Sequence, residues 1–562
     1  MNWISLFVSN LKSKLSDPKS VAILSVITIL SGFFHFYNLG FEYVGDETHV
    51  VTAAAQFLHG IISPKLFGSI FIFGHPPIRV LINIPFMLLF GTTEHVMRFP
   101  HALFGTLSTI LVYLIGEKSF GRQQGIIAAL LYAVSGVSAV NRQSQGVGVY
   151  TFLLLLALFY YLRYFDENSE RKSNQFFLMA TISLIIATYT YLEAVVFWVP
   201  IIAFLVLQQG RTIYQNKSIL RTLFLYGFAL GLYFFFWSYL PILAHQLGYV
   251  NKEISGNLPH ILGRGSEIQF YNNIGEVFLQ YVSYNSIFFV ILLTAGLFAF
   301  LLLIRKTHSN WFCFFYGIPH FLVWAVLFQQ IVMHPMYDMP FFTILAGAGL
   351  SEILKRVQFS YFRTIFIGFL VGGIVLTGLH NFMVHNQHKL STTTDHFVFW
   401  LPSNTSRYPV SGAKAAGYYI RAHSQDINDR VFVSEAEAVN FYAGRLNVSN
   451  QIDRMLRNNE IENIKDLADA MADIDNWEKV KYLVITRDHE LLWEYVTEAY
   501  PLNAVVFVDS EPKLYIFSAN PFGANVDVEY LFAEQYEELF NRMYGTWQKI
   551  IPWFLPMVSE RL

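Results

Sequence analysis

Charge is what this sequence has least of. Only 14% of its 562 residues are Asp, Glu, Lys or Arg, against about 25% in typical soluble domains, and 54% are hydrophobic. This composition excludes a disordered chain, a coiled coil and an ordinary soluble globule. The formal net charge of −2 leaves no basic surplus to neutralise phosphates. We therefore expect no nucleic-acid partner.

Cysteine is nearly absent as well. Cys313 is the single one, and it lies in an apolar run between Trp311 and Phe315. One thiol permits no internal disulfide and no zinc site built from cysteines. The composition instead points to a multi-spanning membrane protein.

Long apolar runs are abundant. A spanning helix needs about 20 mostly apolar residues, and the first such run covers 21–39. Lysines precede this run, no small-residue cleavage site accompanies it, and it is longer than the core of a signal peptide, so we predict an uncleaved first span. Ten further spans are predicted, at 97–116, 124–141, 149–165, 176–192, 194–209, 222–245, 284–304, 311–331, 338–354 and 364–382.

The segment 76–90 is ambiguous because it is apolar but short, and Pro85 interrupts it. Runs of this length more often lie at the membrane interface than cross it. If 76–90 does not cross, the short loops rich in Lys and Arg all fall on one side, whereas a crossing would scatter them over both sides. We therefore predict eleven spans, with the N-terminus inside and the C-terminus outside.

The last third of the chain has a different composition. From about residue 390 the apolar runs shorten and charges return. Helices are predicted at 412–424, 461–471 and 490–500, strands at 430–434 and 480–486, and a hairpin from 504–509 and 513–518. Strands mixed with helices indicate a small α/β domain.

The predicted organisation has three parts. A transmembrane domain covers 1–388 and contains a long first outer loop at about 39–96. An extracytoplasmic α/β domain covers 389–525. The remainder, 526–562, is predicted as an amphipathic helix that lies at the membrane interface or packs on the α/β domain.

Polar residues at the outer mouth of the bundle are expected to form the site, because the spans are almost free of charge. The first outer loop contains Asp46, Glu47 and His49. Adjacent carboxylates in a pocket can take separate roles, one ionised as a base and the other binding a cation or orienting a partner. A solvated turn is the alternative interpretation.

Imidazole and guanidinium groups follow on the same side. His75 precedes a prolyl pair that can start a short helix, which would aim Arg79 along the interface where lipid phosphates lie. Arg98 opens the second span and offers phosphate a fork of donors, or else snorkels to headgroups. Two more outer residues are Glu193 and His334. Each either faces the same cavity or is a structural group whose hydrogen bonds are satisfied within the protein.

The order of these motifs resembles a known family. After the first span come Asp-Glu at 46–47, His-Pro-Pro-Ile at 75–78, Arg-Phe-Pro at 98–100 and Ser-Gln-x-x-x-x-Tyr at 144–150. The pattern covers roughly 20–390 and is similar to the polyprenyl-phosphate-sugar-dependent glycosyltransferases of the GT-C fold. Its nearest relatives look like the protein O-mannosyltransferases (glycosyltransferase family 39) and the transferases that add aminoarabinose to lipid A. The resemblance implies a GT-C-like α-helical polytopic membrane protein with about eleven transmembrane helices and an outer α/β domain.

The resemblance also implies roles for particular residues. Asp46 matches the catalytic base of the first outer loop, and Glu47 matches its neighbour. His75, with Pro76 and Pro77, matches the motif that helps shape the donor and acceptor site. Arg98 matches the arginine that opens the following span, and Tyr150 matches a tyrosine that follows the third span.

Three positions depart from the family pattern. Many bacterial relatives read Ser-Gln-Glu-Ala-Arg-Pro-Tyr, whereas Gly146 and Gly148 stand in place of the Glu and Arg here. Members that bind a metal have an acid just before the prolyl pair, where this chain has Gly74. These departures leave metal binding and the identity of the phosphate ligands open, and an altered, inactive member is an alternative.

The expected function is transfer of a sugar from a polyprenyl-phosphate carrier to a hydroxyl on a protein, lipid or envelope glycan, at the outer face of the cell membrane. Asp46 would take the acceptor proton, and the donor phosphate would meet His75, Arg79, Arg98 or Tyr150. A divalent cation, if one is used, would be held by Glu47, His49, His75 and His334. A lipid or sugar flippase is the chief alternative, but transporters place titratable groups near the bilayer midplane.

Overall fold

The computed structural model describes most of the helical part and much of the C-terminal third. The described residues are 17–37, 39, 47, 50–51, 54, 77–91, 93–142, 144, 146–210, 216–235, 270–304, 307–322, 337–357, 359–386, 397–398, 401–402, 412–424, 429–434, 438–443, 446–447, 452, 455–456, 461–474, 477–487, 490–508, 510–520, 527–533 and 535. The chain forms two compact units. Unit 1 comprises Met1–Leu39, Gly60–Phe86 and His95–Thr405, and unit 2 comprises Gly40–His59, Met87–Glu94 and Ser406–Leu562.

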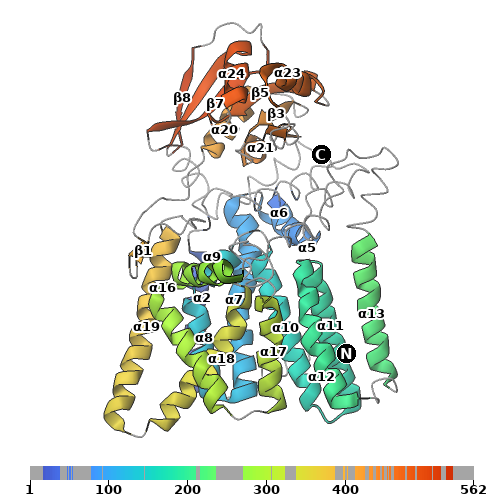
Figure 1. Ribbon diagram of the computed structural model, residues 1–562, viewed down its shortest axis with the longest axis vertical. Coiled ribbons are helices and arrows are strands. Elements are labelled where there is room, and N and C mark those ends of the chain that lie inside the picture. The colour runs from blue at the N-terminus through green and yellow to red at the C-terminus, as the bar shows by residue number, and fades with distance from the viewer. Residues whose placement is uncertain are drawn as a thin grey trace. The chain divides into compact units, whose positions relative to one another are not determined.

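Unit 1 is almost entirely helical (Figure 1). Its helices in chain order, with two that it shares with unit 2, are α2 (Pro18–Phe36), α5 (Pro77–Leu81), α6 (Ile84–Phe90), α7 (Glu94–Phe120), α8 (Arg122–Val134), α9 (Val137–Asn141), α10 (Val147–Asp166), α11 (Glu170–Thr188), η1 (Leu192–Phe197), α12 (Trp198–Gln209), α13 (Lys217–Phe234), α16 (Phe270–Leu303), α17 (His308–Leu322), α18 (Met339–Arg356) and α19 (Ser360–Asn386). Two short strands, β1 (Phe397–Val398) and β2 (Leu401–Pro402), follow as an antiparallel pair.

Every one of the eleven predicted spans overlaps a helix. Among the described residues, five segments are long and apolar enough to cross a membrane, namely Pro18–Phe36, Glu94–Phe120, Val147–Asp166, Asn285–Leu303 and Ser360–Asn381. The chain is thus a multi-pass membrane protein, and the number of eleven spans stays a prediction. The ambiguous segment 76–90 holds only the short helices α5 and α6, neither long enough to cross a hydrocarbon core of about 30 Å.

Two helices differ from the predicted pattern for local reasons. The predicted span 124–141 breaks at Ser135, where the backbone turns extended and the Ser135 hydroxyl donates to the Tyr132 carbonyl at 2.7 Å. Helix α16 kinks at Ser286, which has φ 72° and accepts the Phe289 N–H on its hydroxyl oxygen at 3.3 Å, in the manner of an N-cap. The predicted start of that span at residue 284 therefore coincides with the kink rather than with the start of α16.

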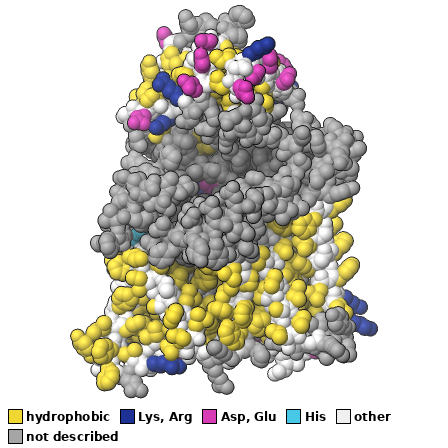
Figure 2. All heavy atoms as spheres, viewed as in Figure 1, with side chains coloured by type: hydrophobic (Ala, Val, Ile, Leu, Met, Phe, Trp, Pro, Cys, Tyr) yellow, Lys and Arg dark blue, Asp and Glu magenta, His cyan; other side chains and the backbone are white. Residues whose placement is uncertain are grey.

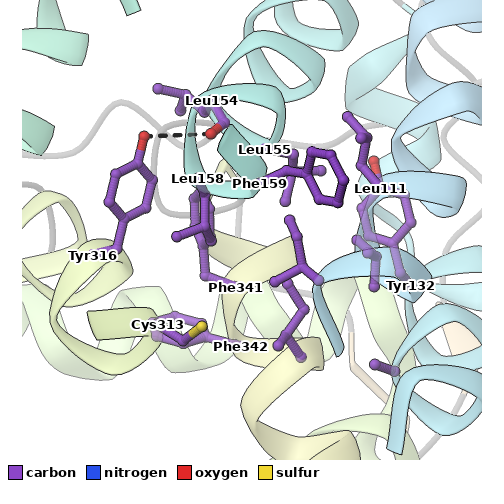
Figure 3. Close-up of a cluster of buried hydrophobic side chains, with 14 of the residues drawn as sticks. Leu111, Tyr132, Leu154, Leu155, Leu158, Phe159, Cys313, Tyr316, Phe341 and Phe342 are labelled. Carbon is purple, nitrogen blue, oxygen red and sulfur yellow. Dashed lines mark hydrogen bonds between the residues drawn. The ribbon is translucent and has the colours of Figure 1, made fainter. Parts of the chain in front are cut away.

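Small residues bring three helices of unit 1 into close contact. A Cβ on Gly349 of α18 would lie 1.9 Å from the Gly296 carbonyl oxygen of α16, and one on Gly347 would lie 2.6 Å from the Ala128 backbone nitrogen of α8. Such close backbone approach is the common way in which helices pack within a membrane. Next to this seam, α10, α17 and α18 share an aromatic and leucine-rich core in which the Tyr316 hydroxyl donates to the Leu154 carbonyl at 3.3 Å (Figure 3).

Most lysines and arginines of unit 1 gather at one end of its helices. Along the chain they alternate between helix starts and helix ends, as the antiparallel order requires, at Lys19, Lys118, Arg122, Arg163, Arg171, Lys172, Lys217, Arg221, Lys355, Arg356 and Arg363. On the face shown in Figure 2, hydrophobic side chains make up most of the coloured surface of the helical part above that end. This separation is the pattern of a membrane-embedded helical bundle.

The C-terminal part of unit 2 is built on a mixed sheet. Its elements are α20 (Ala413–His423), β3 (Arg430–Val433), α21 (Ala438–Ala443), β4 (Leu446–Asn447), α23 (Ile464–Ala472), η8 (Trp477–Lys479), β5 (Val480–Ile485), α24 (Glu490–Ala499), β6 (Leu502–Val508), β7 (Glu511–Ser518) and β8 (Glu529–Phe532). The strand order is β4-β3-β5-β7-β6-β8, and β6 and β7 form the predicted hairpin, with Val508 opposite Glu511. The parallel pairs are β3–β4, β3–β5 and β6–β8.

The start of the predicted C-terminal helix, 526–562, is a correction. Glu529–Phe532 form the edge strand β8, which runs parallel to β6 with Ala504 opposite Glu529. Alternating Tyr530 and Phe532 stay exposed while Leu531 packs inward, which is the period of a strand and not of a helix. The apolar helical face predicted for this tail begins at Leu539 and lies outside the described residues.

Candidate functional site

Arg79 lies near the end of unit 1 that is opposite most of its lysines and arginines, and its side chain has a defined set of contacts that we call the seat of Arg79. It belongs to α5, whose first residue is Pro77, a favoured helix start because proline needs no N–H partner there. The Arg79 Nε donates to the Thr190 carbonyl at 3.0 Å, and the guanidinium carbon lies 3.3 Å from the ring centroid of Tyr191. The helix is also tied to the same strip of chain by its backbone, since the Ile78 N–H donates to the Tyr189 carbonyl. Residues 189–191 therefore hold Arg79 in position.

Tyr191 belongs to a group of three buried rings that we call the tyrosine trio, Tyr150, Tyr191 and Tyr337. Their ring centroids lie 4.9 Å apart for Tyr150 and Tyr191, 5.6 Å for Tyr150 and Tyr337, and 5.4 Å for Tyr191 and Tyr337. Burial raises the pKa of the Tyr337 phenol well above its ordinary value, with Tyr191 and Glu193 adding to the shift. The phenol therefore keeps its proton, and its hydroxyl donates to the Tyr191 hydroxyl at 3.4 Å.

The Tyr150 hydroxyl is the exception in this group. It is fully buried and finds no hydrogen-bond partner among the residues that the structure describes. A buried polar group left unpaired costs about 1–3 kcal/mol, and a bound ligand or an ordered water is a partner that would remove this cost. Of the donor-site residues predicted from the sequence, Arg79 and Tyr150 thus both contact Tyr191.

The two glycines that depart from the family pattern have packing roles here. Gly146 has φ 94°, and a Cβ on it would lie 2.9 Å from the Arg79 Cγ and 3.1 Å from the Thr190 Cγ2. A Cβ on Gly148 would lie 2.2 Å from the His101 carbonyl oxygen. The space that a larger residue would fill at 146 is occupied by the Arg79 side chain.

A second set of hydrogen bonds ties α5 to helix α7. The Asn83 amide donates to the Arg79 carbonyl at 3.0 Å, and its oxygen lies 3.0 Å from the His101 Nε2 on α7. Both Asn83 and His101 are completely buried. The backbone of Arg79 is therefore fastened to α7, while its side chain rests on residues 190 and 191.

The polar turn before α10 is structural where it is described. The Asn141 amide donates to the Tyr132 hydroxyl at 2.8 Å, and Arg142 donates to the Tyr37 carbonyl. Arg98 behaves in the same way, because its Nη1 donates to the Leu39 carbonyl at 2.7 Å and its side chain is completely buried. These groups hold helix ends together, and Arg98 as a donor-phosphate ligand stays a prediction.

The acidic motif of the first loop is described only at Glu47. Glu47, Val50, Val51 and Ala54 are helical, belong to unit 2 and are each at most 1% exposed. Their spacing of three and four residues places them on one face of a helix. The other predicted residues of the catalytic and metal sites lie outside the described residues, namely Asp46, His49, His75 and His334.

Sequence reasoning missed a buried triad in unit 1. The His320 Nδ1 lies 3.0 and 2.9 Å from the two carboxylate oxygens of Asp338, and its Nε2 lies 3.3 Å from the Glu193 Oε2. His320 and Asp338 are completely buried, and the Glu193 side chain is 16% exposed. Two titratable residues in or beside long apolar runs, His320 and Asp338, were the available signal, since intramembrane ionisable groups are expensive and functional by default.

The triad does not resemble a metal site. The two ring nitrogens of an imidazole point in different directions, so Asp338 and Glu193 flank His320 and do not converge with it on one point. Among the described residues, no group of three or more His, Cys, Asp or Glu side chains has the arrangement of a metal site. Of the four predicted metal ligands only Glu47 is described, so the predicted cation site stays a prediction.

Comparison with known proteins agrees with the motifs. Residues 74–239 match the family described as dolichyl-phosphate-mannose-protein mannosyltransferase, a range that includes Arg79, Tyr150 and the 189–193 strip. The resemblance to the GT-C glycosyltransferases is confirmed.

Two relatives illustrate the sequence similarity. An uncharacterized protein of Aquifex aeolicus is 25% identical over 349 residues, which are 60% of this chain and 65% of that protein. YkcB of Bacillus subtilis, named as a candidate mannosyltransferase, is 29% identical over 139 residues, which are 24% of this chain and 19% of that protein. This chain thus spans just under two thirds of the first relative and about a fifth of the second.

Solved structures show the same fold. ArnT from Cupriavidus metallidurans in the apo state superposes with a TM-score of 0.59 and 11% identity over 89% of this chain and 98% of ArnT, and ArnT has also been solved bound to undecaprenyl phosphate. The oligosaccharyltransferase of Archaeoglobus fulgidus superposes with a TM-score of 0.55 and 12% identity over 91% of this chain and 76% of that chain. That enzyme has also been solved with zinc and sulfate and, as AglB, with an inhibitory peptide and a dolichol-phosphate. This chain therefore has a fold similar to those of ArnT and the Archaeoglobus fulgidus oligosaccharyltransferase.

Proposed function

We propose that this protein is a membrane glycosyltransferase that moves a sugar from a polyprenyl-phosphate carrier to a hydroxyl acceptor. The proposal rests on the contact of Arg79 with Tyr191 of the tyrosine trio. In the same trio, the Tyr150 hydroxyl is buried and unpaired among the described residues. An arginine fork and a phenol hydroxyl are both donors, and a phosphate oxygen is the acceptor that such a pair fits. The family match over 74–239 and the undecaprenyl phosphate bound by ArnT support the same ligand class.

The proposed reaction is a displacement at the anomeric carbon. Asp46 takes the proton of the acceptor hydroxyl as its oxygen forms the new glycosidic bond, a contribution of roughly 10²–10⁴-fold for general base catalysis. The bond between the anomeric carbon and the phosphate oxygen breaks, and its electron pair stays on the phosphate. Arg79 and Tyr150 then stabilise the charge that develops on that leaving group.

A divalent cation is a further part of this proposal. Glu47, His49, His75 and His334 are the side chains that would hold a divalent cation, and oxygen and imidazole ligands of this kind suit zinc or manganese. A cation there would add positive charge beside the departing phosphate.

The sidedness of the site is also part of the proposal. Short loops rich in Lys and Arg face the cytoplasm, and the basic residues of unit 1 gather at one end of its helices. Arg79 lies on α5, which follows α2 and precedes α7, and so is placed at the other end. We therefore propose that transfer takes place on the extracytoplasmic side.

The test is a transfer assay with purified protein in lipid nanodiscs. The protein is given radiolabelled mannosyl-phosphate-polyprenol and envelope extract, and label that moves to an acceptor is counted. Asp46→Asn keeps the size of the side chain but removes the base, so transfer should be nearly lost while membrane insertion is normal. Full activity in this variant would eliminate Asp46 as the base.

Arg79→Lys tests the donor site in the same assay. Lysine keeps the charge but loses both the planar fork and the stacking on Tyr191, so transfer should fall about tenfold or more. Arg163→Lys is the matched control, because Arg163 also lies over an aromatic ring, that of Phe159 at 5.4 Å, but at the basic end of α10. Equal losses in the two variants would argue against a role for Arg79 in donor binding. Movement of the labelled lipid between leaflets without transfer would instead support a flippase.

A further inference from the structure

The Glu193–His320–Asp338 triad joins three separate elements of unit 1. Glu193 lies in η1, His320 lies in α17, and Asp338 immediately precedes α18. The imidazole ring also stacks on Phe197 of η1, with centroids 5.1 Å apart and planes 23° apart. His320 therefore fastens η1 by a polar and an aromatic contact at once.

The protons in this triad can be counted from its geometry. Ionised carboxylates only accept hydrogen bonds, so each ring nitrogen of His320 must share a proton with the acid that faces it. Either the ring carries both protons and both acids are ionised, or one acid carries a proton and the ring is neutral. In both cases two protons are shared by three groups, and the triad carries one net negative charge.

The triad includes a residue that lies next to the Arg79 contacts along the chain. The Thr190 carbonyl accepts from the Arg79 Nε and the Tyr191 ring lies under its guanidinium carbon, and both residues are within three positions of Glu193. Gly146 packs closely against both residues, since a Cβ on it would lie 2.9 Å from the Arg79 Cγ and 3.1 Å from the Thr190 Cγ2. A shift of residues 190–193 would therefore move the support under Arg79.

We propose that His320 is a positioning residue for the donor site, which fixes residues 190–193, and through them Arg79, by binding Glu193 against Asp338. This inference rests on the proposed role of Arg79 in holding the carrier phosphate. His320 itself is completely buried, so we assign it no contact with the substrate. Its effect is on affinity for the phosphate end of the carrier, and not on proton transfer to or from the reacting atoms.

The first test is binding of undecaprenyl phosphate to purified protein in nanodiscs, with undecaprenol as the comparison ligand. Wild type should prefer the phosphate. Glu193→Ala and His320→Ala should bind it about tenfold more weakly, since each loses a charge-assisted hydrogen bond. Glu193→Gln should bind as wild type, because its amide oxygen still accepts from the His320 Nε2.

Tyr316→Phe is the matched control for damage to α17. Tyr316 lies one turn before His320 on the same helix, is completely buried and loses one hydrogen bond on substitution, to the Leu154 carbonyl (Figure 3). Its affinity for undecaprenyl phosphate should stay at the wild-type value. An equal loss in Tyr316→Phe and His320→Ala would show a general packing effect and overturn the proposal.

A second measurement does not depend on any ligand. Arg79 is 6% exposed, so phenylglyoxal should modify it slowly in wild type and in Glu193→Gln, and at least several-fold faster in Glu193→Ala and His320→Ala. Mass spectrometry of the peptide that contains Arg79 measures the rate.

The outcomes separate this inference from the proposed function. If wild type shows no preference for undecaprenyl phosphate over undecaprenol while the labelling of Arg79 changes as expected, the donor-site role fails and the positioning of Arg79 stands. If wild type binds but the variants neither lose affinity nor expose Arg79, the positioning role is wrong. The Glu193→Gln variant could also bind the carrier as wild type does but transfer no sugar. That result would assign Glu193 an acid–base role and overturn the proposed positioning role.

Discussion

At the scale of single residues, the Tyr150 hydroxyl combines full burial with the lack of a partner among the described residues. Natural proteins rarely keep such a group without a reason. Tyr132 offers a contrast within the same bundle, because its hydroxyl accepts from the Asn141 amide at 2.8 Å. The two phenols are equally buried, so their hydroxyls can be compared directly.

Tyr150→Phe should leave the thermal stability unchanged or raise it, because the variant no longer buries an unpaired hydroxyl. Its affinity for undecaprenyl phosphate should fall about tenfold if that hydroxyl donates to the phosphate. Tyr132→Phe should show the opposite pattern, with a loss of about 1 kcal/mol in stability and unchanged affinity. Melting curves and binding curves of both variants check this, and a Tyr150→Phe protein that binds normally would remove Tyr150 from the donor site.

Gly146 is a second residue with a definite expectation. Gly146→Ala should cost about 1–2 kcal/mol for the left-handed backbone and should also displace Arg79, since the new Cβ would lie 2.9 Å from its Cγ. Gly91→Ala is the control, because Gly91 has φ 87° and nothing within 4 Å of the added Cβ. Both variants should melt lower than wild type, but only Gly146→Ala should lose sugar transfer. Similar transfer rates in the two would contradict the seat described for Arg79.

At the scale of helices, the seam of α8, α16 and α18 determines how closely the bundle packs. Gly349→Ala would place a Cβ 1.9 Å from the Gly296 carbonyl oxygen, so the helices must separate and stability should fall by about 1–3 kcal/mol. Gly372→Ala on α19 meets nothing within 4 Å and should be neutral or stabilise by up to about 1 kcal/mol. Unfolding of the two variants in detergent measures the difference. A stable Gly349→Ala protein would mean that the seam is not this close.

Helices were the part of the fold that the sequence predicted best. Apolar length is a local property, so each predicted span overlaps a helix, and the hairpin of β6 and β7 follows from two short apolar runs around Ser510. The break at Ser135 is stabilised by hydrogen bonds from the Ser135 hydroxyl to the Tyr132 carbonyl and from the Gly136 N–H to the Asn285 Oδ1, and nothing in the apolar pattern marks it.

The candidate site was predictable only in part. Arg79 and Tyr150 were found through motifs, but their meeting at Tyr191 depends on how α5 packs against the strip after α11. His320 and Asp338 are single polar residues separated by 17 others, and only the packing of α17 beside α18 brings them within 3.0 Å. Contacts between distant segments carry no local signal, which is why the triad was missed.

At the scale of the whole molecule, the two compact units do not follow the order of the chain. Unit 2 includes Met87–Glu94 as well as the C-terminal third. Within it the Glu94 Oε1 accepts from the Lys414 Nζ at 2.8 Å and from the Tyr442 hydroxyl at 2.9 Å, and the side chains of Glu94 and Lys414 are 1% and 4% exposed. A single boundary at residue 388, as predicted from composition, therefore cannot describe a unit made of separate segments. The predicted domain boundary stays a prediction.

Glu94→Ala should destabilise unit 2 by about 3–5 kcal/mol, because it leaves the Lys414 ammonium buried without its carboxylate. Trypsin should then cut within 406–535 at concentrations that wild type resists. Tyr442→Phe removes one neutral donor from the same carboxylate and should cost only about 1 kcal/mol. Limited proteolysis with mass spectrometry compares the variants, and wild-type resistance in Glu94→Ala would show that this ion pair adds little.

Unit 2 is assembled from segments that lie far apart in the chain, and this affects the order in which it can fold during synthesis. Glu47, Val50, Val51 and Ala54 are buried in a unit whose last segment begins at Ser406. At about 5–20 residues per second, the ribosome needs on the order of 20–70 s to translate the intervening stretch. During that interval Glu47 and its buried neighbours lack the segment of unit 2 that begins at Ser406. Insertion of the nascent chain into the bilayer therefore precedes the folding of unit 2.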